Sequence, residues 1–248
     1  MITIKSKSEI EKMREAGKIT GDALRLIEKH IRPGVTTLEL DKIAYDFIRK
    51  QGATPSFLNY SGFPGSICAS PNSWVIHGIP SKNVVLKEGD IISIDMGAQK
   101  DGYHGDAART FAVGKISDEA QKLIDVTRQS FFEGIKYAVH GGKLGDVSAA
   151  IQEYVEKHGY SVVRDFVGHG IGRNLHEDPS VPNFGRYGKG VKLAQGMTLA
   201  VEPMVNEGSY DVVVLDDDWT VETEDGSLSA HYENTILITK GECEILTL

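Results

Sequence analysis

Apolar and polar positions follow a helical spacing and then a strand spacing, and this order occurs twice along the chain. Apolar residues three and four apart predict helices over about residues 8–31, 36–51, 118–139 and 144–158. Ser8 with Glu11, and Thr36 with Glu39, have the spacing of capping boxes and mark the starts of the first two helices. Each half of the chain therefore begins with two amphipathic helices.

Segments rich in Ile, Val and Thr follow each pair of helices. These segments predict strands over 90–98, 102–113, 162–168, 197–205 and 230–239. Helices followed by strands, twice, are typical of an α/β or α+β architecture. Two segments, 53–74 and 173–192, have no clear period. Long loops in compact proteins are usually functional or disordered, and the aromatic residues Phe57, Tyr60 and Phe63 predict the wall of a pocket in the first of them.

Short motifs recur at matching places in the two halves. Aligning the halves pairs His77 with His169, Asp95 with Glu202, His104 with His231, and Asp106 with Glu233. Duplicated halves usually face each other across a pseudo-twofold axis, so equivalent positions converge on the seam between them. We therefore expect one two-lobed domain over residues 1–248, with halves of about 1–115 and 116–248 and the active site at the seam.

Composition is that of an ordinary soluble protein, with 40% apolar and 25% charged residues. The net charge of -8 argues against direct nucleic-acid recognition, although the first fifty residues hold 11 Lys and Arg against 8 acidic residues. That local excess predicts a solvated helix face in preference to a docking patch for an anion. No apolar run is long enough for a membrane span, and the first residues are charged where a signal peptide would be apolar. The two cysteines have no motif spacing. We expect a cytoplasmic location and reduced thiols.

Four acids and one imidazole form the main candidate for chemistry. This five-residue cluster consists of Asp95, Asp106, His169, Glu202 and Glu233. Two carboxylates ~5 Å apart repel by about 3 kcal/mol at an effective dielectric constant of ~20, so four together require protons or cations. Oxygen-rich ligands without a thiolate suit Mn(II), Fe(II) or Co(II) better than a structural zinc site. Two divalent ions would balance the charge and activate water, which predicts hydrolysis.

Position separates these residues from ordinary surface acids. Any single acid is more often a solvated or capping residue. Asp95 and Glu202, however, each end an apolar strand, where an unpaired carboxylate is costly. His77 and His169 favour function as a matched pair, whereas His176 has no counterpart and would alone be taken as an exposed loop residue. His104 and His231 are interpreted as supporting hydrogen-bonding residues.

The motifs, in their order, resemble one known family over essentially the whole chain. They are His77-Gly-Ile-Pro80, Ile94-Asp95, Gly102-Tyr-His-Gly-Asp106, Gly168-His-Gly-Ile-Gly172, Leu175-His176-Glu177, Glu202-Pro203 and Glu233. The chain resembles the bacterial type I methionine aminopeptidases, which have the pita-bread fold. The resemblance implies an α/β (α+β) fold of two pseudo-symmetric halves with antiparallel sheet and helices.

The resemblance also implies a role for each residue of the cluster. Asp95 would chelate one metal ion, Asp106 and Glu233 would bridge two, and His169 with Glu202 would complete the other site. Glu202 would also shuttle a proton. His77 and His176 would contact the scissile amide. The implied cofactors are two divalent ions per chain, from Co(II), Mn(II), Fe(II) or Zn(II).

Further residues are implied for the substrate and for a monovalent cation. The methionine side chain would lie among Phe57, Tyr60, Phe63, Cys68, Leu175 and Trp219. A monovalent cation would bind near Asn72, Trp74 and Ser229, mainly through backbone oxygens. The implied partners are nascent polypeptide N-termini, with ribosome association left open and a monomer expected. Two residues depart from the family pattern: Asn234, where many relatives carry His, and Pro71. Both leave open how the residues around the metal ligands tune the site.

Two other functions compete with this interpretation. A proline-specific aminopeptidase or dipeptidase on the same fold generally carries an added N-terminal domain, for which this chain has no room. A binding protein that has kept the fold and lost catalysis should have lost metal ligands, and none is missing here. Methionine removal therefore remains the first hypothesis.

Overall fold

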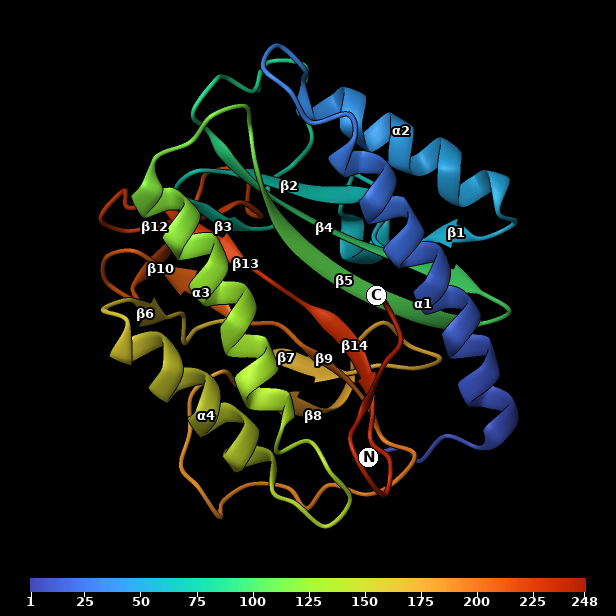
Figure 1. The fold of residues 1–248 in the computed structure, drawn as a ribbon. Helices are drawn as coiled ribbons and strands as arrows, with labels where there is room; N and C mark the ends of the chain where they lie inside the picture. Colours follow the sequence, from blue (N-terminus) through green and yellow to red (C-terminus); the bar gives the residue numbers. More distant parts are fainter.

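Four helices form where the apolar spacing predicts them. The computed structural model describes residues 1–248, and its helices are α1 (Lys7–Glu28), α2 (Thr37–Lys50), α3 (Asp118–Ile135) and α4 (Leu144–Lys157) (Figure 1). The box at Thr36 and Glu39 is confirmed, because the Glu39 carboxylate accepts from the Thr36 amide at 2.8 Å and the Glu39 amide donates to Thr36 Oγ1 at 3.2 Å. None of the helices is long and apolar enough to cross a membrane.

Three helix boundaries differ from the prediction, one of them the end of α1, which is at Glu28 and not near residue 31. The first helix begins earlier, because Glu9 accepts from the Ser6 amide at 2.8 Å and the box lies at Ser6 instead of Ser8. Helix α3 ends at Ile135 and not near 139. Beyond its end, the amide of His140 donates to Thr239 O at 3.0 Å and that of Gly141 to Leu193 O at 2.9 Å. These amides bond outside the helix, so the helix stops before them.

The first-half strands form a long antiparallel hairpin. Strands β4 (Ile91–Lys100) and β5 (Tyr103–Ala112) pair over their whole lengths. Asp101 and Gly102 connect them with φ values of 49° and 79°, as a two-residue hairpin turn requires. On its other edge β4 pairs with β2 (Ile67–Pro71) and β1 (Thr54–Pro55). Both predicted strands of this half are confirmed.

The second-half strands are shorter than predicted because each is interrupted. The predicted strands become β6 (Ser161–Val162) with β7 (Gly168–Gly170), β9 (Thr198–Val201) with β10 (Met204–Asn206), and β13 (Ser229–His231) with β14 (Asn234–Leu237). One break falls at Glu202 and Pro203, where proline has no amide to donate to a ladder. Another falls at Tyr232 and Glu233. Two acids of the cluster therefore lie in gaps between strands.

The two halves repeat one strand order around their central strands. The order β5-β4-β2 in the first half corresponds to β14-β9-β7 in the second, where β8 (Glu177–Val181) and β15 (Glu244–Ile245) extend the edges. His169 lies on β7, whereas His77 follows β3 (Trp74–Ile76). Strand β3 pairs with β12 (Val221–Thr223), which pairs with β11 (Val212–Val214), and not with β4. The strand positions therefore do not reproduce the sequence pairing of His77 with His169.

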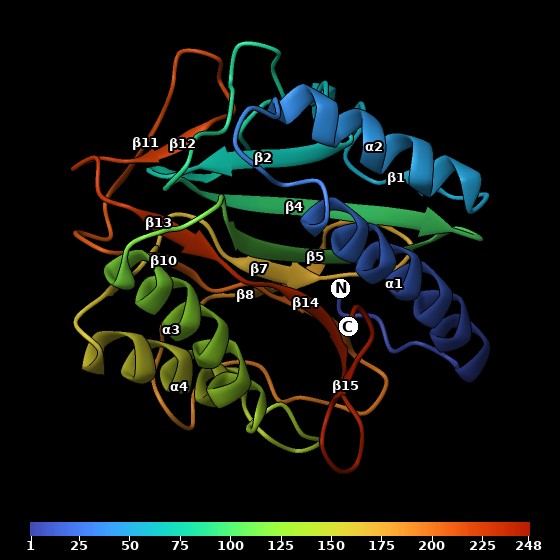
Figure 2. The ribbon, with the colours of Figure 1, turned by 45° about the horizontal axis from the view of Figure 1, so that its top comes forward.

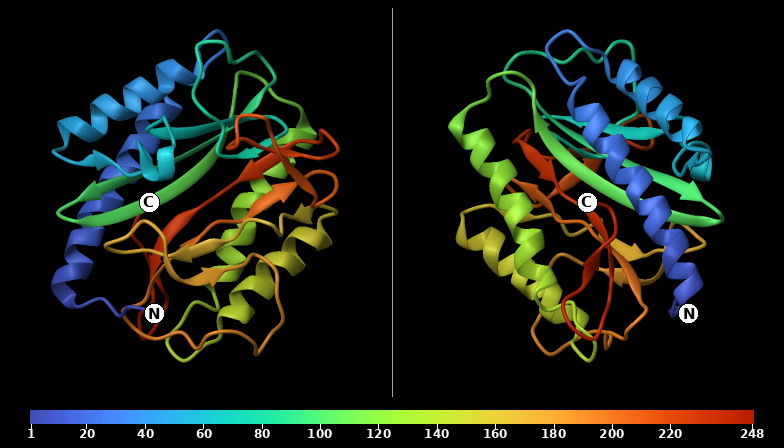
Figure 3. Two further views of the ribbon diagram at one scale, coloured as in Figure 1. Left: turned by 180° about the vertical axis from the view of Figure 1, so that it is seen from behind. Right: turned by 45° about the vertical axis from the view of Figure 1, so that its right-hand side comes forward.

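The helices pack against one side of the strands, and two apolar clusters lie beneath them. Figures 2 and 3 show α1 and α2 over the first-half strands and α3 and α4 over the second-half strands. The clusters contain 17 and 20 buried residues, one for each helix pair. Helix α1 lies directly on β5, since a Cβ on Gly105 would be 2.7 Å from Gly17 Cα. The opposite side of the strands is left to loops and to the functional site.

Candidate metal centre and substrate cavity

Neighbouring strands bring the five-residue cluster together. Asp95 on β4 faces Ala108 of β5, and Asp106 faces Gly97, so the two aspartates are diagonal neighbours on one face of the hairpin. His169 on β7 pairs with Ala200, two residues before Glu202. Glu202 and Glu233 reach the same place from the breaks after β9 and β13. All five residues line one cavity.

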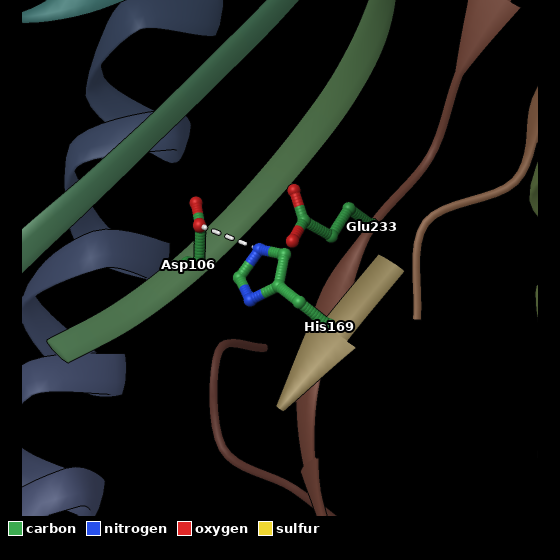
Figure 4. A group of neighbouring side chains, drawn as sticks. All are labelled: Asp106, His169 and Glu233. Carbon is green, nitrogen blue, oxygen red and sulfur yellow. Dashed lines mark ion pairs between the residues drawn. The ribbon is translucent and has the colours of Figure 1, made fainter. Parts of the chain in front are cut away.

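His169 presents a ring nitrogen to the carboxylates. Its Nε2 atom lies 3.8 Å from Asp106 Oδ2, as Figure 4 shows, and 3.6 Å from Glu202 Oε1. Its Nδ1 atom lies 2.8 Å from the Gly170 carbonyl oxygen, to which it donates. That bond places the proton on Nδ1 and leaves the Nε2 lone pair directed into the cluster. One potential ligand atom from each of Asp106, His169 and Glu233 lies within 4.8 Å of the others.

Two acids of the cluster are buried, and three of its carboxylate oxygens lack a polar partner. Asp106 is 3% exposed and Glu233 is 2% exposed. Asp95 Oδ1, Asp106 Oδ1 and Glu233 Oε1 are buried without a hydrogen-bond partner. Buried polar atoms normally have a partner, and an ionised one without a partner is strongly unfavourable. These orphaned oxygens, with the imidazole nitrogen beside them, fit bound divalent cations.

The pKa shifts of the cluster residues also favour a bound cation. Burial raises the pKa of Asp95, of Asp106 and of Glu202 well above the ordinary range, and a neighbouring carboxylate raises each further. Burial also raises the pKa of Glu233, and the charge of Asp106 adds to the effect. The pKa of His169 falls to about 3, first through burial and then through His176. In the metal-free cluster the protonated form of the acids and the neutral form of the His169 imidazole are therefore favoured. A metal ion would displace those protons and bind the imidazole nitrogen.

A cavity of about 260 Å³ extends from the cluster. It is lined by every residue that the sequence placed in the methionine pocket, namely Phe57, Tyr60, Phe63, Cys68, Leu175 and Trp219, and by His77 and His176. The rings of Phe63 and Trp219 meet edge to face with 5.1 Å between centroids. The cavity thus has a polar end at the cluster and an apolar end formed by aromatic rings and a thiol.

Four further lining residues were missed from the sequence: Ser61, Ile76, Phe166 and Val167. Ile76 directly precedes His77, and Phe166 lies three residues before His169, so proximity to the histidine motifs was an available signal. The ring of Phe166 meets that of His77 edge to face at 5.7 Å. Ser61 has a φ of 49°, which no sequence feature indicates.

The two histidines outside the cluster are held by different contacts. His77 has a φ of 59°, and burial, then the charge of His176, lowers its pKa to about 4. His176 Nδ1 is hydrogen bonded to Tyr60 Oη at 2.7 Å, and its ring centroid lies 4.2 Å from that of His169. Burial also lowers the pKa of His176. Both imidazoles are therefore neutral at physiological pH and can each donate one N–H.

A buried ion pair anchors the loop that carries His176. The neighbouring Glu177 accepts from Lys5 Nζ and from Thr3 Oγ1, both at 2.7 Å. The side chains of Lys5 and Glu177 are 5% and 8% exposed. Glu177 also accepts from the Asn174 amide at 3.2 Å, within its own loop. The N-terminal segment thus fixes the position of a loop that is distant from it in sequence.

Comparison with known proteins identifies the family. Residues 11–240 match metallopeptidase family M24. The chain belongs to metallopeptidase family M24. It is 62% identical over 248 residues to the methionine aminopeptidase of Clostridium acetobutylicum, covering 100% of this chain and 99% of that protein.

Solved structures of M24 proteins show the same fold. The methionine aminopeptidase of Thermotoga maritima has a TM-score of 0.98 and 50% identity, covering 100% of this chain and 99% of that one. The Xaa-Pro dipeptidase of Bacillus anthracis has a TM-score of 0.79 and 28% identity, and the match covers 98% of this chain but 61% of the dipeptidase. The expected pita-bread fold is confirmed, and the dipeptidase contains a large part that this M24 chain does not match.

The structure shows the contacts of Asn234 and Pro71, the two residues of this M24 chain that depart from the family pattern. Asn234 Oδ1 accepts from Arg109 Nη2 at 2.7 Å and from Thr247 Oγ1 at 3.0 Å. Arg109 also donates to the carbonyl of Glu233. Asn234 therefore helps to hold the backbone that carries a cluster residue. Pro71 is the last residue of β2, opposite Ile92, where the missing amide costs little.

The structure also shows the contacts of the other residues named from the sequence of this M24 chain. His104 Nδ1 is hydrogen bonded to Ser56 Oγ at 2.9 Å, which fits a supporting role. Both ring nitrogens of His231 are buried without a partner. Asn72 and Ser229 are in contact through a backbone hydrogen bond of 2.9 Å from the Ser229 amide to the Asn72 carbonyl, and Trp74 begins β3 nearby in sequence.

Proposed function

We propose that this protein removes the N-terminal methionine of peptides and nascent proteins by metal-assisted amide hydrolysis. The observation that carries the proposal is the cavity itself, in which orphaned carboxylate oxygens at one end face a slot of aromatic rings and a thiol at the other. Relatives that match the chain over its whole length bear the name methionine aminopeptidase. Family M24 accounts for the metal-assisted chemistry.

The cluster would hold two divalent ions, from Co(II), Mn(II), Fe(II) or Zn(II). Asp95 would bind one ion, Asp106 and Glu233 would bind both, and His169 with Glu202 would bind the other. Four carboxylates match the charge of two such ions, and each orphaned oxygen would gain a partner. When bound, the ions supply Lewis-acid polarisation and an activated water.

The slot would hold the methionine side chain. Phe57, Phe63 and Trp219 offer ring faces and edges, and Cys68 and Leu175 complete the wall. A flexible, polarizable thioether makes favourable contacts with such rings. The family resemblance further implies a narrow place for the second residue, so a small residue such as Ala, Gly or Ser should follow methionine.

Three side chains would act on the scissile amide. His77 and His176, neutral because burial lowers the pKa of each, would donate hydrogen bonds to the amide as negative charge develops on its oxygen. Tyr60 would orient His176 through its hydroxyl. Glu202 would take a proton from the attacking water and return it to the leaving nitrogen. Exclusion of bulk water by the aromatic wall strengthens each of these interactions.

The wider setting follows from the same proposal. Residues 1–248 would act as one catalytic domain, because the cluster takes residues from both halves, about 1–115 and 116–248. The enzyme would work as a monomer in the cytoplasm on nascent polypeptide N-termini. Backbone oxygens near Asn72, Trp74 and Ser229 would bind a monovalent cation.

A peptide panel tests the specificity. The metal-loaded protein should release methionine from Met-Ala-Ser and Met-Gly-Met, hydrolyse Met-Trp-Ser poorly, and leave Ala-Pro peptides intact. Quantified amino-acid release gives kcat/KM for each peptide. Preferred cleavage of the Ala-Pro peptide would favour the proline-specific alternative, and no release from any peptide would favour a binding protein. Equal values for Met-Ala-Ser and Met-Trp-Ser would contradict the narrow second pocket.

A further inference from the structure

A second cavity, of about 330 Å³, lies between α1 and α3 over strands β5 and β13. It shares no lining residue with the first cavity. The first cavity is lined by strands, loops and the short 3-10 helix Tyr60–Gly62, whereas the second is bordered by the α-helices α1 and α3. Figure 1 shows α1 and α3 on the near side of the strands, with the chain end between them. The second cavity is therefore separate from the proposed metal centre.

Three arginines converge on this cavity. Arg25 comes from α1, Arg109 from β5 and Arg128 from α3, and Glu28 is the one acidic side chain in the lining. A chain with a net charge of -8 thus concentrates positive charge at one place.

Two of these guanidinium groups have no carboxylate partner. Arg109 donates to the carbonyls of Ala108 and Glu233 and to the Asn234 side chain, and it lies over the Tyr232 ring at 4.2 Å. Arg128 makes no hydrogen bond and no ion pair, and its guanidinium contacts only the ring of Phe132, at 5.5 Å.

The third guanidinium shares its acid with another cation. Arg25 Nη2 contacts Asp22 Oδ1 at 2.7 Å, while Lys18 Nζ contacts the other oxygen of Asp22 at 2.6 Å. The charge of Arg25 is therefore only partly balanced. Cationic side chains that outnumber the carboxylates of a concave site repel one another and focus a positive potential there. An anion bound between them would relieve that repulsion.

We propose that this cavity, the arginine cleft of Arg25, Arg109 and Arg128, binds a small oxyanion with two or more negative charges. The guanidinium fork matches the paired oxygens of phosphate and carboxylate groups, which defines the ligand chemistry. The volume accommodates a compact metabolite-sized anion. Tyr232 in the lining offers a hydroxyl group as a further polar contact.

Titration calorimetry on the full, metal-loaded chain tests the cleft, with sulfate as the probe and ionic strength held constant with sodium chloride. The wild type should show saturable sulfate binding. Arg128→Gln and Arg25→Gln should each raise the Kd about tenfold or more, because each removes one guanidinium contact. Glu28→Gln should lower the Kd by removing the one acidic side chain of the lining. Arg25 and Arg128 are exposed, so these variants should fold, and thermal melts check this.

Two further variants test whether the anion binds at the arginine cleft and nowhere else. Lys122→Gln removes the same charge from α3 at a position outside the lining and should leave the Kd unchanged. Asp106→Ala, which disrupts the proposed metal centre, should bind sulfate as the wild type does. An absence of saturable binding to the wild type, or an equal effect of Lys122→Gln and Arg128→Gln, would overturn the proposal. Loss of sulfate binding in Asp106→Ala would also overturn it, by placing the anion at the metal centre.

A second titration, with succinate, identifies the ligand's functional group. Tighter binding of sulfate supports a phosphate-type ligand in the cleft, and tighter binding of succinate supports a dicarboxylate. Either result should be sensitive to Arg128→Gln in the same way. Binding of succinate that Arg128→Gln does not weaken would contradict the cleft as its site.

Discussion

His176 is the residue whose chemical role depends most on its local contacts. Its Nδ1 is bound to Tyr60 and its ring lies beside His169, yet it is not within the cluster of potential ligands. If it donates to the amide oxygen as charge develops, its loss affects the transition state. His176→Ala should therefore lower kcat about 100-fold or more with bound metal unchanged.

Kinetics and metal analysis on one preparation of His176→Ala distinguish the alternatives. A kcat within a few-fold of the wild type would make His176 a plain loop residue, and loss of metal would make it a ligand. Tyr60→Phe is the matched control, because it removes only the hydroxyl that orients the imidazole. It should lower kcat by a smaller factor than His176→Ala does.

Asp95 and Asp106 should differ in what their removal does to metal binding. Asp106 lies close to both His169 and Glu233, and we propose that it is shared between two ions. Asp106→Ala should weaken both binding events in titration calorimetry, whereas Asp95→Ala should weaken mainly one. Identical loss of metal in the two variants would show that the assignment of the shared ligand is wrong.

The sequence predicts those site residues that belong to a recognisable pattern. It does not predict those that only the fold places in the cavity. Asp95 and Glu202 were found because each follows an apolar run at a matching place, although Asp95 lies within β4 and only Glu202 follows the end of its strand. The alignment of His77 with His169 was incorrect in structural terms, since β3 and β7 hold different positions beside their central strands. Ser61 lines the cavity through a strained turn that has no sequence signature.

At the scale of elements, the helices were predictable and the interrupted strands were not. Apolar spacing and capping boxes depend on neighbours within one turn, which sequence records directly. The breaks at Glu202 and Glu233 depend on pairing with other strands and on the placement of carboxylates in the cavity. An apolar run such as 197–205 predicts one strand although Pro203 interrupts its ladder.

The ion pair of Lys5 and Glu177 couples the N-terminal segment to the His176 loop. Lys5→Met would leave a buried carboxylate without its cation, and unfolding experiments should show a loss of about 3 kcal/mol. The kcat should fall as well, because the loop loses its anchor, while metal content stays the same. Lys7→Met, at an exposed position, is the control and should change neither. Unaltered stability in Lys5→Met would contradict the anchoring role.

At the scale of the whole molecule, metal binding should be linked to pH. Burial raises the pKa of Asp95, Asp106, Glu202 and Glu233 in the metal-free chain, so their protonated forms are favoured at mildly acidic pH. A metal ion needs the ionised carboxylates, so its binding must release those protons and its affinity must fall as pH falls. Calorimetry in buffers of different ionisation enthalpy measures the release. Heats that do not depend on the buffer would contradict the raised pKa values.

The same raised pKa values make the stability of the metal-free chain depend on pH. A carboxyl group whose pKa is raised by folding stabilises the fold below its unfolded pKa, and this contribution is lost as pH rises through the folded value. Towards neutral pH the metal-free cluster therefore costs stability that bound metal restores. Both halves contribute to this cluster, so we expect bound divalent ions to stabilise the whole molecule.

The most direct test of the central claim is methionine release from Met-Ala-Ser by one preparation in three states: as purified, after exhaustive chelation, and after Mn(II) or Co(II) is added back. We predict release in the first state, its loss on chelation and its recovery with the added ion, because the clustered carboxylates have no other way to generate a nucleophile. Full methionine release by the chelated protein would contradict the account.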